Sequence, residues 1–495
     1  MKKYLMRGPK LLLGRKPIDQ ILACNDIGGN VGNLIYLHAV LRTLSRDDVE
    51  IHMDDYKINR ELYTPEDVDY INNTYDAYIC PMADAFRDSF NLFLKRYAAF
   101  IRELKIPFYV IGVGMRASIE PDFTEQWSRD PYVKEFVKAV LEHSSKIGIR
   151  GELTGKYLQR LGFREEIDYT VIGCPSMYTF GKDLKIRKPV VNKDSLINVN
   201  YGTTMKRSVG SILYNNVLKQ YPNSVYTGQL IRELKTVFLG YKGLPKAPSY
   251  YPNSLDHDLF QEDRVRYFVQ AEDWIRYFKD FDLSIGGRLH GNVSAMLGGC
   301  PAIFIPSDAR MRELTEYHHL YCVNADEIGP DTSLEDIVSG YDDGPMLACH
   351  ERNFNHYIDF LNENGISHRY QDHDKADDSW LFEKPSDGSE TGAVPPATFL
   401  DRESLLDRSA DFAQSSKEYY FDFIETKKAR LRMINASLKE ERRDLRDEKK
   451  QVMDEREALK RENRKLRAEL DRANGELNRK SVRIARKFAN FVHRY

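Results

Sequence analysis

The chain has 495 residues, which is enough for two or three domains. Its 73 basic and 75 acidic residues give a formal net charge of -2, which argues against a uniformly basic nucleic-acid binder and against a uniformly acidic disordered chain. The charge is unevenly distributed, because residues 425–495 contain 23 basic and 13 acidic residues, whereas residues 1–424 contain 50 and 62. The sequence therefore indicates an acidic body with a basic tail and no nucleic-acid partner.

The six cysteines are scattered and form no CxxC pair, which is typical of reduced thiols rather than of disulfides or a metal site. The apolar run at residues 11–13 is too short for a signal peptide, and no stretch reaches the roughly eighteen apolar residues of a membrane span. We therefore expect a cytoplasmic location, with at most peripheral contact with the inner face of a membrane.

Short apolar runs alternate with helical patterns from residue 18 to about residue 370, which predicts an α/β body with parallel sheets. In such sheets the ligand site lies at the carboxyl ends of the strands. The predicted strands cover residues 20–24, 77–80, 108–112, 146–149, 169–172, 196–200, 224–227, 281–285 and 302–305.

A polar, basic, proline-containing segment at residues 180–194 separates the two series of strands. It predicts two Rossmann-like domains, at residues 1–190 and 191–370, with the helix 350–362 at the end of the second. Residues 371–416 are acidic and rich in proline and glycine, which is typical of a linker.

Residues 417–478 are predicted to form a long charged helix. Large apolar residues recur there every seven positions, at Leu438, Leu445, Val452, Leu459 and Leu466. One apolar residue per heptad predicts a weak coiled coil that makes the protein a homo-oligomer, although i,i+4 ion pairs could also support a single solvated helix.

The tail at residues 479–495 has the pattern of a helix with one apolar and one strongly basic face. Such a helix can bind an anionic membrane surface or pack on a protein, and the sequence leaves both interpretations open.

The segment at residues 281–313 carries the most informative motif. A predicted strand runs through Gly286-Gly287 into Arg288-Leu289-His290-Gly291 and then into a helix of small residues. A helix N-terminus attracts anions, a guanidinium binds carboxylate or phosphate, and an imidazole can transfer a proton. The alternative is that Arg288 and His290 only hold the loop.

Two further turns could contribute to the same site. Arg150 ends a predicted strand and precedes a helix, where it could bind an anion or pair with Glu152. The glycine-rich segment 25–33 is expected to join a strand to a helix and to let a ligand approach the backbone. It fits neither the dinucleotide nor the P-loop pattern, so it predicts no nucleotide.

Five segments together resemble the polysaccharide pyruvyl transferase family, in that family's order, within residues 20–365. They are GGNVGNLIYLHAVLRTL near the start, YVIGVG at 109–114, IGIRGELTGKYLQRLGF at 147–163, VIGCPSM at 171–177 and IGGRLHGNVSAMLGGCPAIFI at 285–305.

The resemblance implies a GT-B-like fold, in which two Rossmann-like domains face each other across a cleft. It also implies phosphoenolpyruvate as donor substrate, a glycan acceptor that can be lipid-linked, and a cyclic ketal as product, with no metal or cofactor. His290 is then the expected catalytic acid, and the expected substrate-binding residues are Arg288, Arg150, Gly291, Asn30, Gly32 and Ser176.

Asn33, Cys174 and Cys300 depart from the residues expected in this family and are predicted to line the cleft, which leaves the acceptor open. Two other functions compete. A glycosyltransferase using a nucleotide sugar would need an acidic ribose-binding residue, and residues 224–228 offer none. A non-catalytic scaffold built around the coiled coil would not need Arg288, His290 and Arg150.

Overall fold

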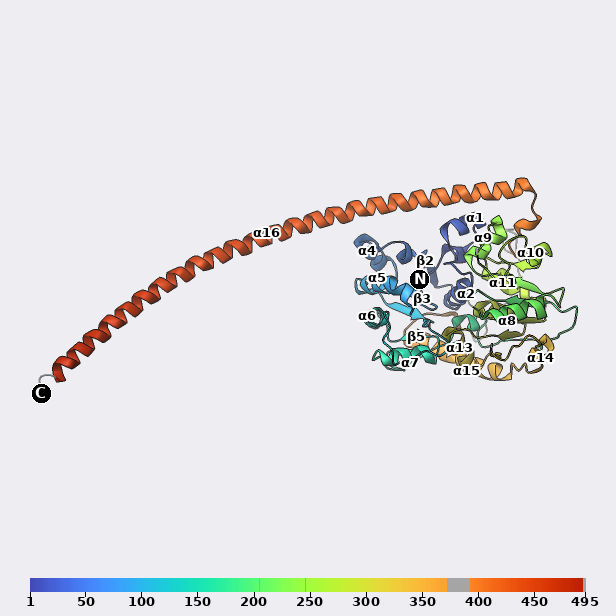
Figure 1. Cartoon of the computed structure of the whole chain (residues 1–495), viewed down its shortest axis with the longest axis horizontal. Coiled ribbons are helices and arrows are strands. Elements are labelled where there is room, and N and C mark those ends of the chain that lie inside the picture. Colours follow the sequence, from blue (N-terminus) through green and yellow to red (C-terminus); the bar gives the residue numbers. More distant parts are fainter. Residues whose placement is uncertain (204, 245, 372–391, 493–495) are drawn as a thin grey trace. The chain divides into compact units, whose positions relative to one another are not determined.

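The computed structural model describes residues 1–203, 205–244, 246–371 and 392–492. The chain divides into two compact units, Met1–Ser416 and Lys417–Tyr495. The first unit contains two parallel sheets with helices around them (Figure 1).

The first sheet has the order β2-β1-β3-β4 and is parallel throughout. Its strands are β1 (Lys2–Met6), β2 (Val49–Met53), β3 (Ala77–Pro81) and β4 (Phe108–Ile111). The parallel pair β5 (Ile147–Ile149) and β6 (Tyr169–Val171) continues it through a bridge between Val113 and Ile149. The strand order reverses between β1 and β3, which is where open α/β sheets bind ligands.

The second sheet has the order β11-β10-β7-β8-β9 and is also parallel. Its order reverses between β7 and β10. The strands are β7 (Ile197–Asn200), β8 (Val225–Thr227), β9 (Val265–Arg266), β10 (Leu283–Gly286) and β11 (Ala302–Phe304).

Helices connect the parallel strands, as βαβ crossovers require. In the first half they are α1 (Ile18–Cys24), α2 (Gly32–Leu44), α3 (Lys57–Arg60), α4 (Pro65–Thr74), α5 (Asn91–Arg102), α6 (Asp130–Leu141) and α7 (Glu152–Arg160). In the second half they are α8 (Arg207–Ile212), α9 (Ile231–Leu239), α10 (Asp258–Gln261), α11 (Ala271–Tyr277), α12 (Leu289–Leu297), α13 (Ala309–Tyr317), α14 (Leu334–Ser339) and α15 (Gly344–Glu363). The predicted fold class, two Rossmann-like domains in a GT-B-like arrangement followed by a long helix, is confirmed.

Eight of the nine predicted strands overlap strands of the structure, and the first one is wrong. Residues 20–24 belong to α1, which starts after Pro17 and buries Ile21 and Leu22. A five-residue apolar run does not distinguish a strand from a short helix. The segment 25–33 therefore joins two helices. The prediction missed β1 and β2, of which β2 forms the edge of the first sheet and β1 lies between β2 and β3.

Helix α15 lies within the predicted second domain, residues 191–370, but it packs against the first half of the chain. The ammonium of Lys146 lies 2.7 Å from the carboxylate of Glu363, and Asn364 accepts the backbone N–H of Ser145 at 3.0 Å. The chain therefore crosses twice between the halves, once near residues 172–196 and once before α15.

The predicted linker 371–416 is wrong over its last part. Residues 372–391 lie outside the described residues, and Val394 donates its backbone N–H to the carbonyl of Tyr267. Helix α16 then begins at Arg402 and runs to Val492, without a break at the predicted start of the tail. Arg408 lies over the ring of Phe238, so residues 402–416 pack on the first unit.

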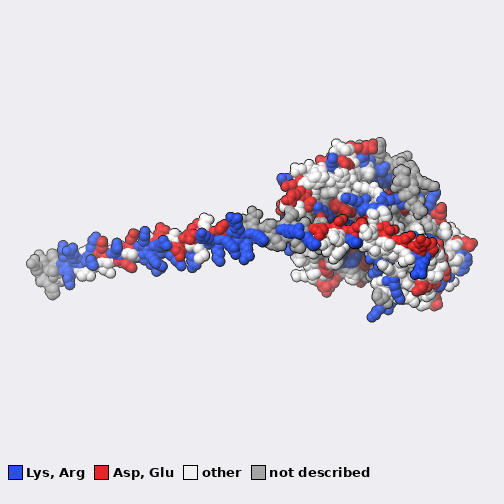
Figure 2. Space-filling model, turned by 90° about the horizontal axis from the view of Figure 1, so that it is seen from above, with Lys and Arg blue, Asp and Glu red and all other residues white. Residues whose placement is uncertain are grey.

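The second unit consists of the rest of α16, along which basic and acidic side chains alternate in clusters (Figure 2). Large apolar side chains of the heptad pattern are exposed, by 58% at Leu445, 62% at Leu459 and 57% at Leu466. In the part of the chain that the structure describes, no helix is long and apolar enough to cross a membrane.

Candidate functional site

His290 lies where the strand order of the second sheet reverses. The chain leaves β10 at Gly286, whose φ is +154°, and a Cβ there would lie 1.8 Å from the carbonyl oxygen of Asn200. Only glycine fits this turn, which is why the strand ends in Gly286-Gly287. Helix α12 begins directly after it, so His290 stands in the first turn, at the positive end of the helix dipole.

The N-terminus of α2, from the first half, meets His290 from the other side. A Cβ on Gly32 would lie 3.1 Å from the Cβ and Nδ1 atoms of His290, so this glycine makes room for the imidazole. Asn30 accepts the backbone N–H of Gly32 at 2.8 Å and so shapes the start of α2. Two helix N-termini therefore converge on His290, and both favour a bound anion.

Arg150 lies next to this point and is fully buried. It donates from Nε to the carbonyl of Gly112 at 2.6 Å, and its guanidinium lies 5.1 Å from the ring centre of Tyr36 on α2. The Nη1 atom of Arg150 is buried without a hydrogen-bond partner. A bound anion would give this nitrogen the hydrogen-bond partner that a buried N–H group requires.

A cluster of arginines surrounds one buried carboxylate, Asp84, which follows β3. Arg87 pairs with the Oδ1 atom of Asp84 at 2.7 Å, and both Arg310, at 3.5 Å, and Arg116 pair with its Oδ2 atom. The Nε atom of Arg310 is buried without a hydrogen-bond partner. Positive charge therefore exceeds negative charge at the carboxyl end of the first sheet, as an anionic ligand requires.

These surroundings favour the neutral imidazole of His290. Burial lowers its pKa most, the charges of Arg150 and Arg310 lower it further, and Asp84 opposes them only in part. The pKa of His290 therefore lies well below its ordinary value. An anion bound next to it would raise this pKa, so the ring can act as an acid only when the site is filled.

Arg288 points away from His290 and into a buried ion pair. Its Nη1 and Nη2 atoms donate to the two oxygens of Glu233 at 2.9 and 2.6 Å, and its Nε donates to the carbonyl of Tyr201 at 2.9 Å. Burial raises the pKa of Glu233, but Arg288 outweighs it and the pKa lies below its usual range. Every nitrogen of this guanidinium is engaged within the second half.

The remaining predicted residues are buried near the site. Ser176 lies 2.9 Å from the thiol of Cys174, and that thiol is 3.6 Å from Nε2 of His290. A Cβ on Gly291 would meet Gln229 at 2.5 Å, so this glycine allows close packing. Cys300 does not line the cleft as predicted, because it is fully buried before β11 and its nearest polar partner is the carbonyl of Pro301.

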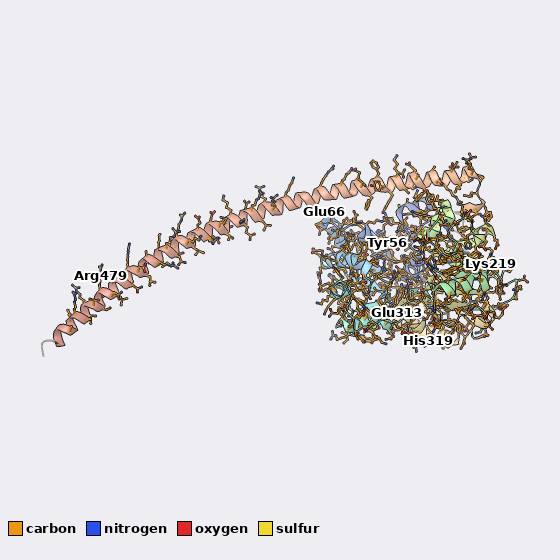
Figure 3. All side chains as sticks on the ribbon, in the orientation of Figure 1. Tyr56, Glu66, Lys219, Glu313, His319 and Arg479 are labelled. Carbon is orange, nitrogen blue, oxygen red and sulfur yellow. The ribbon has the colours of Figure 1, made fainter. Side chains whose placement is uncertain are left out.

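Glu313 on α13 is a buried residue that sequence reasoning missed (Figure 3). Its carboxylate accepts the backbone N–H and the hydroxyl of Thr154 at 2.9 and 2.8 Å, in the first turn of α7. This contact joins the second half of the chain to the helix that follows Arg150. Burial raises the pKa of Glu313 to about 7, against the hydrogen bonds from Thr154.

This raised pKa predicts a pH dependence of stability. The carboxyl of Glu313 has a pKa of about 7 in the native protein and of 4.5 in the unfolded chain. The free energy of unfolding therefore falls as the pH rises from 4.5 to 7, by on the order of 3 kcal/mol in total. We expect Glu313→Gln to flatten the dependence of the unfolding free energy in urea between pH 5 and 8. Glu316→Gln, on the exposed face of α13, is the control, and equal slopes in wild type and Glu313→Gln would contradict the assignment.

Among the described residues, no group of three or more His, Cys, Asp or Glu side chains is placed to hold a metal ion. The site that the structure does assemble combines a neutral imidazole, two helix N-termini and several arginines at the switch points of two Rossmann-like sheets. This is a site for an anionic ligand in an α/β protein of two similar halves.

The sequence profile of the polysaccharide pyruvyl transferase family matches residues 30–309, more than half of the chain. The chain belongs to this family and is a transferase. Among functionally curated proteins, no sequence matches it.

Distant similarities to solved structures cover about three quarters of the chain. Anabaena HepE, solved with UDP and glucose, is 14% identical, with a TM-score of 0.37, and the match covers 74% of this chain and 98% of that one. The UDP-GlcNAc 2-epimerase of Methanocaldococcus jannaschii is 11% identical, with a TM-score of 0.35 and coverage of 73% and 99%.

Proposed function

We propose that this protein transfers the pyruvyl group of phosphoenolpyruvate to two hydroxyl groups of one sugar in a cell-surface or exported polysaccharide. The product is a cyclic ketal, and phosphate is released. The observation that carries the proposal is the placement of His290 between the N-termini of α2 and α12, beside Arg150 and Arg310. Family membership supports the same reaction class.

The donor fits the chemistry of these residues. Phosphoenolpyruvate carries a carboxylate and a phosphate on a small carbon frame, so its site needs at least two anion-binding groups. The buried, unpartnered Nη1 of Arg150 and Nε of Arg310 can serve one anion each, and the positive ends of the two helix dipoles favour both anions. The donor carries its own leaving group, so the scheme uses no resident cofactor.

His290 is proposed to protonate the methylene carbon of the donor. The first sugar hydroxyl then bonds to the central carbon, phosphate leaves with the C–O bond electrons, and the second hydroxyl bonds to the oxocarbenium ion that remains. Of the two hydroxyl protons released, one restores His290 and the other leaves with phosphate. The charges of the bound donor raise the pKa of His290 and so supply the imidazolium that this step needs.

Arg288 has a positioning role in this proposal rather than a direct contact with the donor. Its ion pair with Glu233 fixes the residue that precedes α12, and Glu233 also accepts the backbone N–H groups of Gln229 and Leu230 at 2.7 and 2.6 Å. Leu230 forms a β-bridge with Asn30. The pair therefore braces both loops that present their helix N-termini to His290.

The proposal is tested by incubating the protein with phosphoenolpyruvate and fractions of bacterial glycans and following phosphate release. We expect release that requires both the donor and an acceptor fraction. Release from a nucleotide sugar, with none from phosphoenolpyruvate, would contradict the proposal.

We also infer that α16 joins two or more copies of the chain through its heptad residues. Leu445, Leu459 and Leu466 are large, exposed and spaced by multiples of seven, and no single helix needs that spacing. We expect light scattering to give an oligomer for the full chain, and a monomer for a chain that ends after Ser416 or carries Lys at these three positions. Equal masses for the full and shortened chains would contradict this inference and favour a single solvated helix.

The end of α16 is proposed to hold the enzyme at the inner face of an anionic membrane, where a lipid-linked acceptor would lie. Five basic residues between 479 and 487 support this role, each contributing about 1 kcal/mol near such a surface. Residues 493–495 lie outside the described residues. Sedimentation with anionic liposomes should require residues 479–495 and weaken with salt. Equal pelleting without them would leave packing on a protein as the role of this segment.

A further inference from the structure

A polar cavity lies where the strand order of the first sheet reverses, next to the site described above. It has a volume of about 90 Å³, which is room for several waters or for the substituent of a sugar. Residues that follow β1 and β3 line it, and residues of α2 and α3 close it. The polar and charged lining residues are Arg7, Asn33, Tyr36, Tyr56, Asn59, Asp84 and Arg87.

The cavity lining includes a tyrosine hydroxyl and an asparagine oxygen that have no hydrogen-bond partner among the described residues. Tyr56, labelled in Figure 3, is 5% exposed. Its hydroxyl is buried without a hydrogen-bond partner, as is the Oδ1 atom of Asn59. Buried polar groups are nearly always paired, so these two point to a ligand that donates and accepts hydrogen bonds. The aromatic ring of Tyr56 is held in place by the guanidinium of Arg7, 4.8 Å from its centre.

The charge of the cavity favours an anion. Arg7 and Arg87 both line it, whereas Asp84 is its only lining carboxylate among the described residues. That carboxylate also pairs with Arg116 and Arg310, so it does not cancel the charge of Arg87. A ligand here therefore meets excess positive charge together with neutral hydrogen-bonding groups, which is the chemistry of a sugar that carries an acidic substituent.

The cavity is separate from the place where the donor is proposed to bind. Tyr36 stands between them, with its ring 5.7 Å from the ring of His290 and with its side chain lining the cavity. Arg7 and Arg87 line the cavity, whereas Arg150 and Arg310, which are proposed to hold the donor, are not among its lining residues. One site can thus hold the donor while the other holds a group of the acceptor.

We propose that this cavity is an acceptor subsite that binds an anionic substituent, a carboxylate or a phosphate, on a sugar of the polysaccharide. The inference rests on the proposed function, because it names the substrate class of the same enzyme. Arg87 provides the charge contact, and Tyr56 and Asn59 bind neighbouring hydroxyl groups. The enzyme would then select acidic glycans over neutral ones.

Calorimetry with the full-length protein tests this proposal. The probes are methyl glucoside, methyl glucuronide and glucose 6-phosphate, which compare no charge, a carboxylate and a phosphate. We expect at least one charged probe to bind about tenfold more tightly than the neutral probe. The charged probe that binds better identifies the substituent.

Two variants locate the binding. Arg87→Gln leaves Asp84 paired with Arg116 and Arg310, and it should remove most of the preference for the charged probe. Tyr56→Phe removes only the hydroxyl and should weaken all three probes by about threefold to tenfold. Arg102→Gln, an exposed arginine of α5 that pairs with Glu135, is the matched control for lost charge. Phosphoenolpyruvate should bind Tyr56→Phe and Arg102→Gln as it binds the wild type, and Arg87→Gln should weaken donor binding much less than it weakens binding of the charged probe.

Three results would overturn the proposal: no preference for either charged probe, a preference that Arg87→Gln leaves intact, or a loss of donor binding in Arg87→Gln equal to the loss of probe binding. The last would make the cavity part of the donor site. These outcomes are independent of the reaction itself. Charged sugars that bind through Arg87 without any pyruvyl transfer would refute the proposed function alone, and pyruvyl transfer without charge preference would refute this inference alone.

Discussion

Replacing His290 with glutamine is expected to lower the rate of pyruvyl transfer by roughly two to four orders of magnitude, while donor affinity stays within about threefold of wild type. Glutamine keeps a polar side chain in the space that Gly32 leaves, but it cannot deliver a proton to carbon. Steady-state kinetics with saturating acceptor and calorimetry with phosphoenolpyruvate separate the two effects.

The control for this variant is His143→Gln, because His143 lies at the end of α6, away from β10 and α12. Its turnover should equal that of the wild type. Turnover of His290→Gln within about threefold of wild type would make His290 a residue that only holds the loop.

Replacing Arg288 with alanine is expected to destabilise the first unit by about 3–5 kcal/mol, because it leaves the carboxylate of Glu233 buried without its partner. The two side chains are 9% and 6% exposed, so water cannot replace the lost ion pair. The free energy of unfolding in urea measures this loss. Donor affinity, measured on the fraction that remains folded at low temperature, should change much less than stability.

The double variant Arg288→Ala with Glu233→Gln tests whether the unpaired carboxylate of Glu233 causes the loss of stability. Removing the carboxylate charge as well should recover a large part of the lost stability, because the buried charge is the main cost. If the double variant instead loses as much stability as the two single variants together, the two residues are not coupled. A normal stability of Arg288→Ala with lost donor binding would instead return Arg288 to the donor site.

Much of the architecture was predictable, because buried parallel strands form short continuous apolar runs that helices separate. The run at residues 77–80 and the run at 302–305 are of this kind. The errors have physical causes. Residues 20–24 are apolar over too short a distance to reveal the helical period, and β1 begins at Lys2, where charged residues hide a half-buried strand.

The candidate site was predictable only in part. The motif around His290 and the position of Arg150 follow from strands that end in polar residues, and the structure brings these two together with Gly32 and Asn30. Sequence reasoning could not show that Arg288 pairs with Glu233, because the two are 55 residues apart and meet only in the fold.

The rule that ligand sites lie at the carboxyl ends of parallel strands could also have found the arginine cluster. Asp84 and Arg87 follow β3, and Asp308 and Arg310 follow β11, so both pairs stand at carboxyl ends of strands. Their pairing across the two halves depends on how the domains meet, which no local pattern encodes. No sequence pattern pointed to Glu313, because it caps α7 through a contact with Thr154, which is far away in the sequence.

Pyruvyl transfer in deuterated water, followed by mass spectrometry and NMR of the sugar product, tests the central claim most directly. If phosphoenolpyruvate is the donor and its methylene carbon is protonated before ketal formation, the product carries a methyl group with a single deuterium atom on a carbon bonded to two sugar oxygens. A product that retains the methylene group, or that carries a sugar from a nucleotide donor instead, would contradict the account.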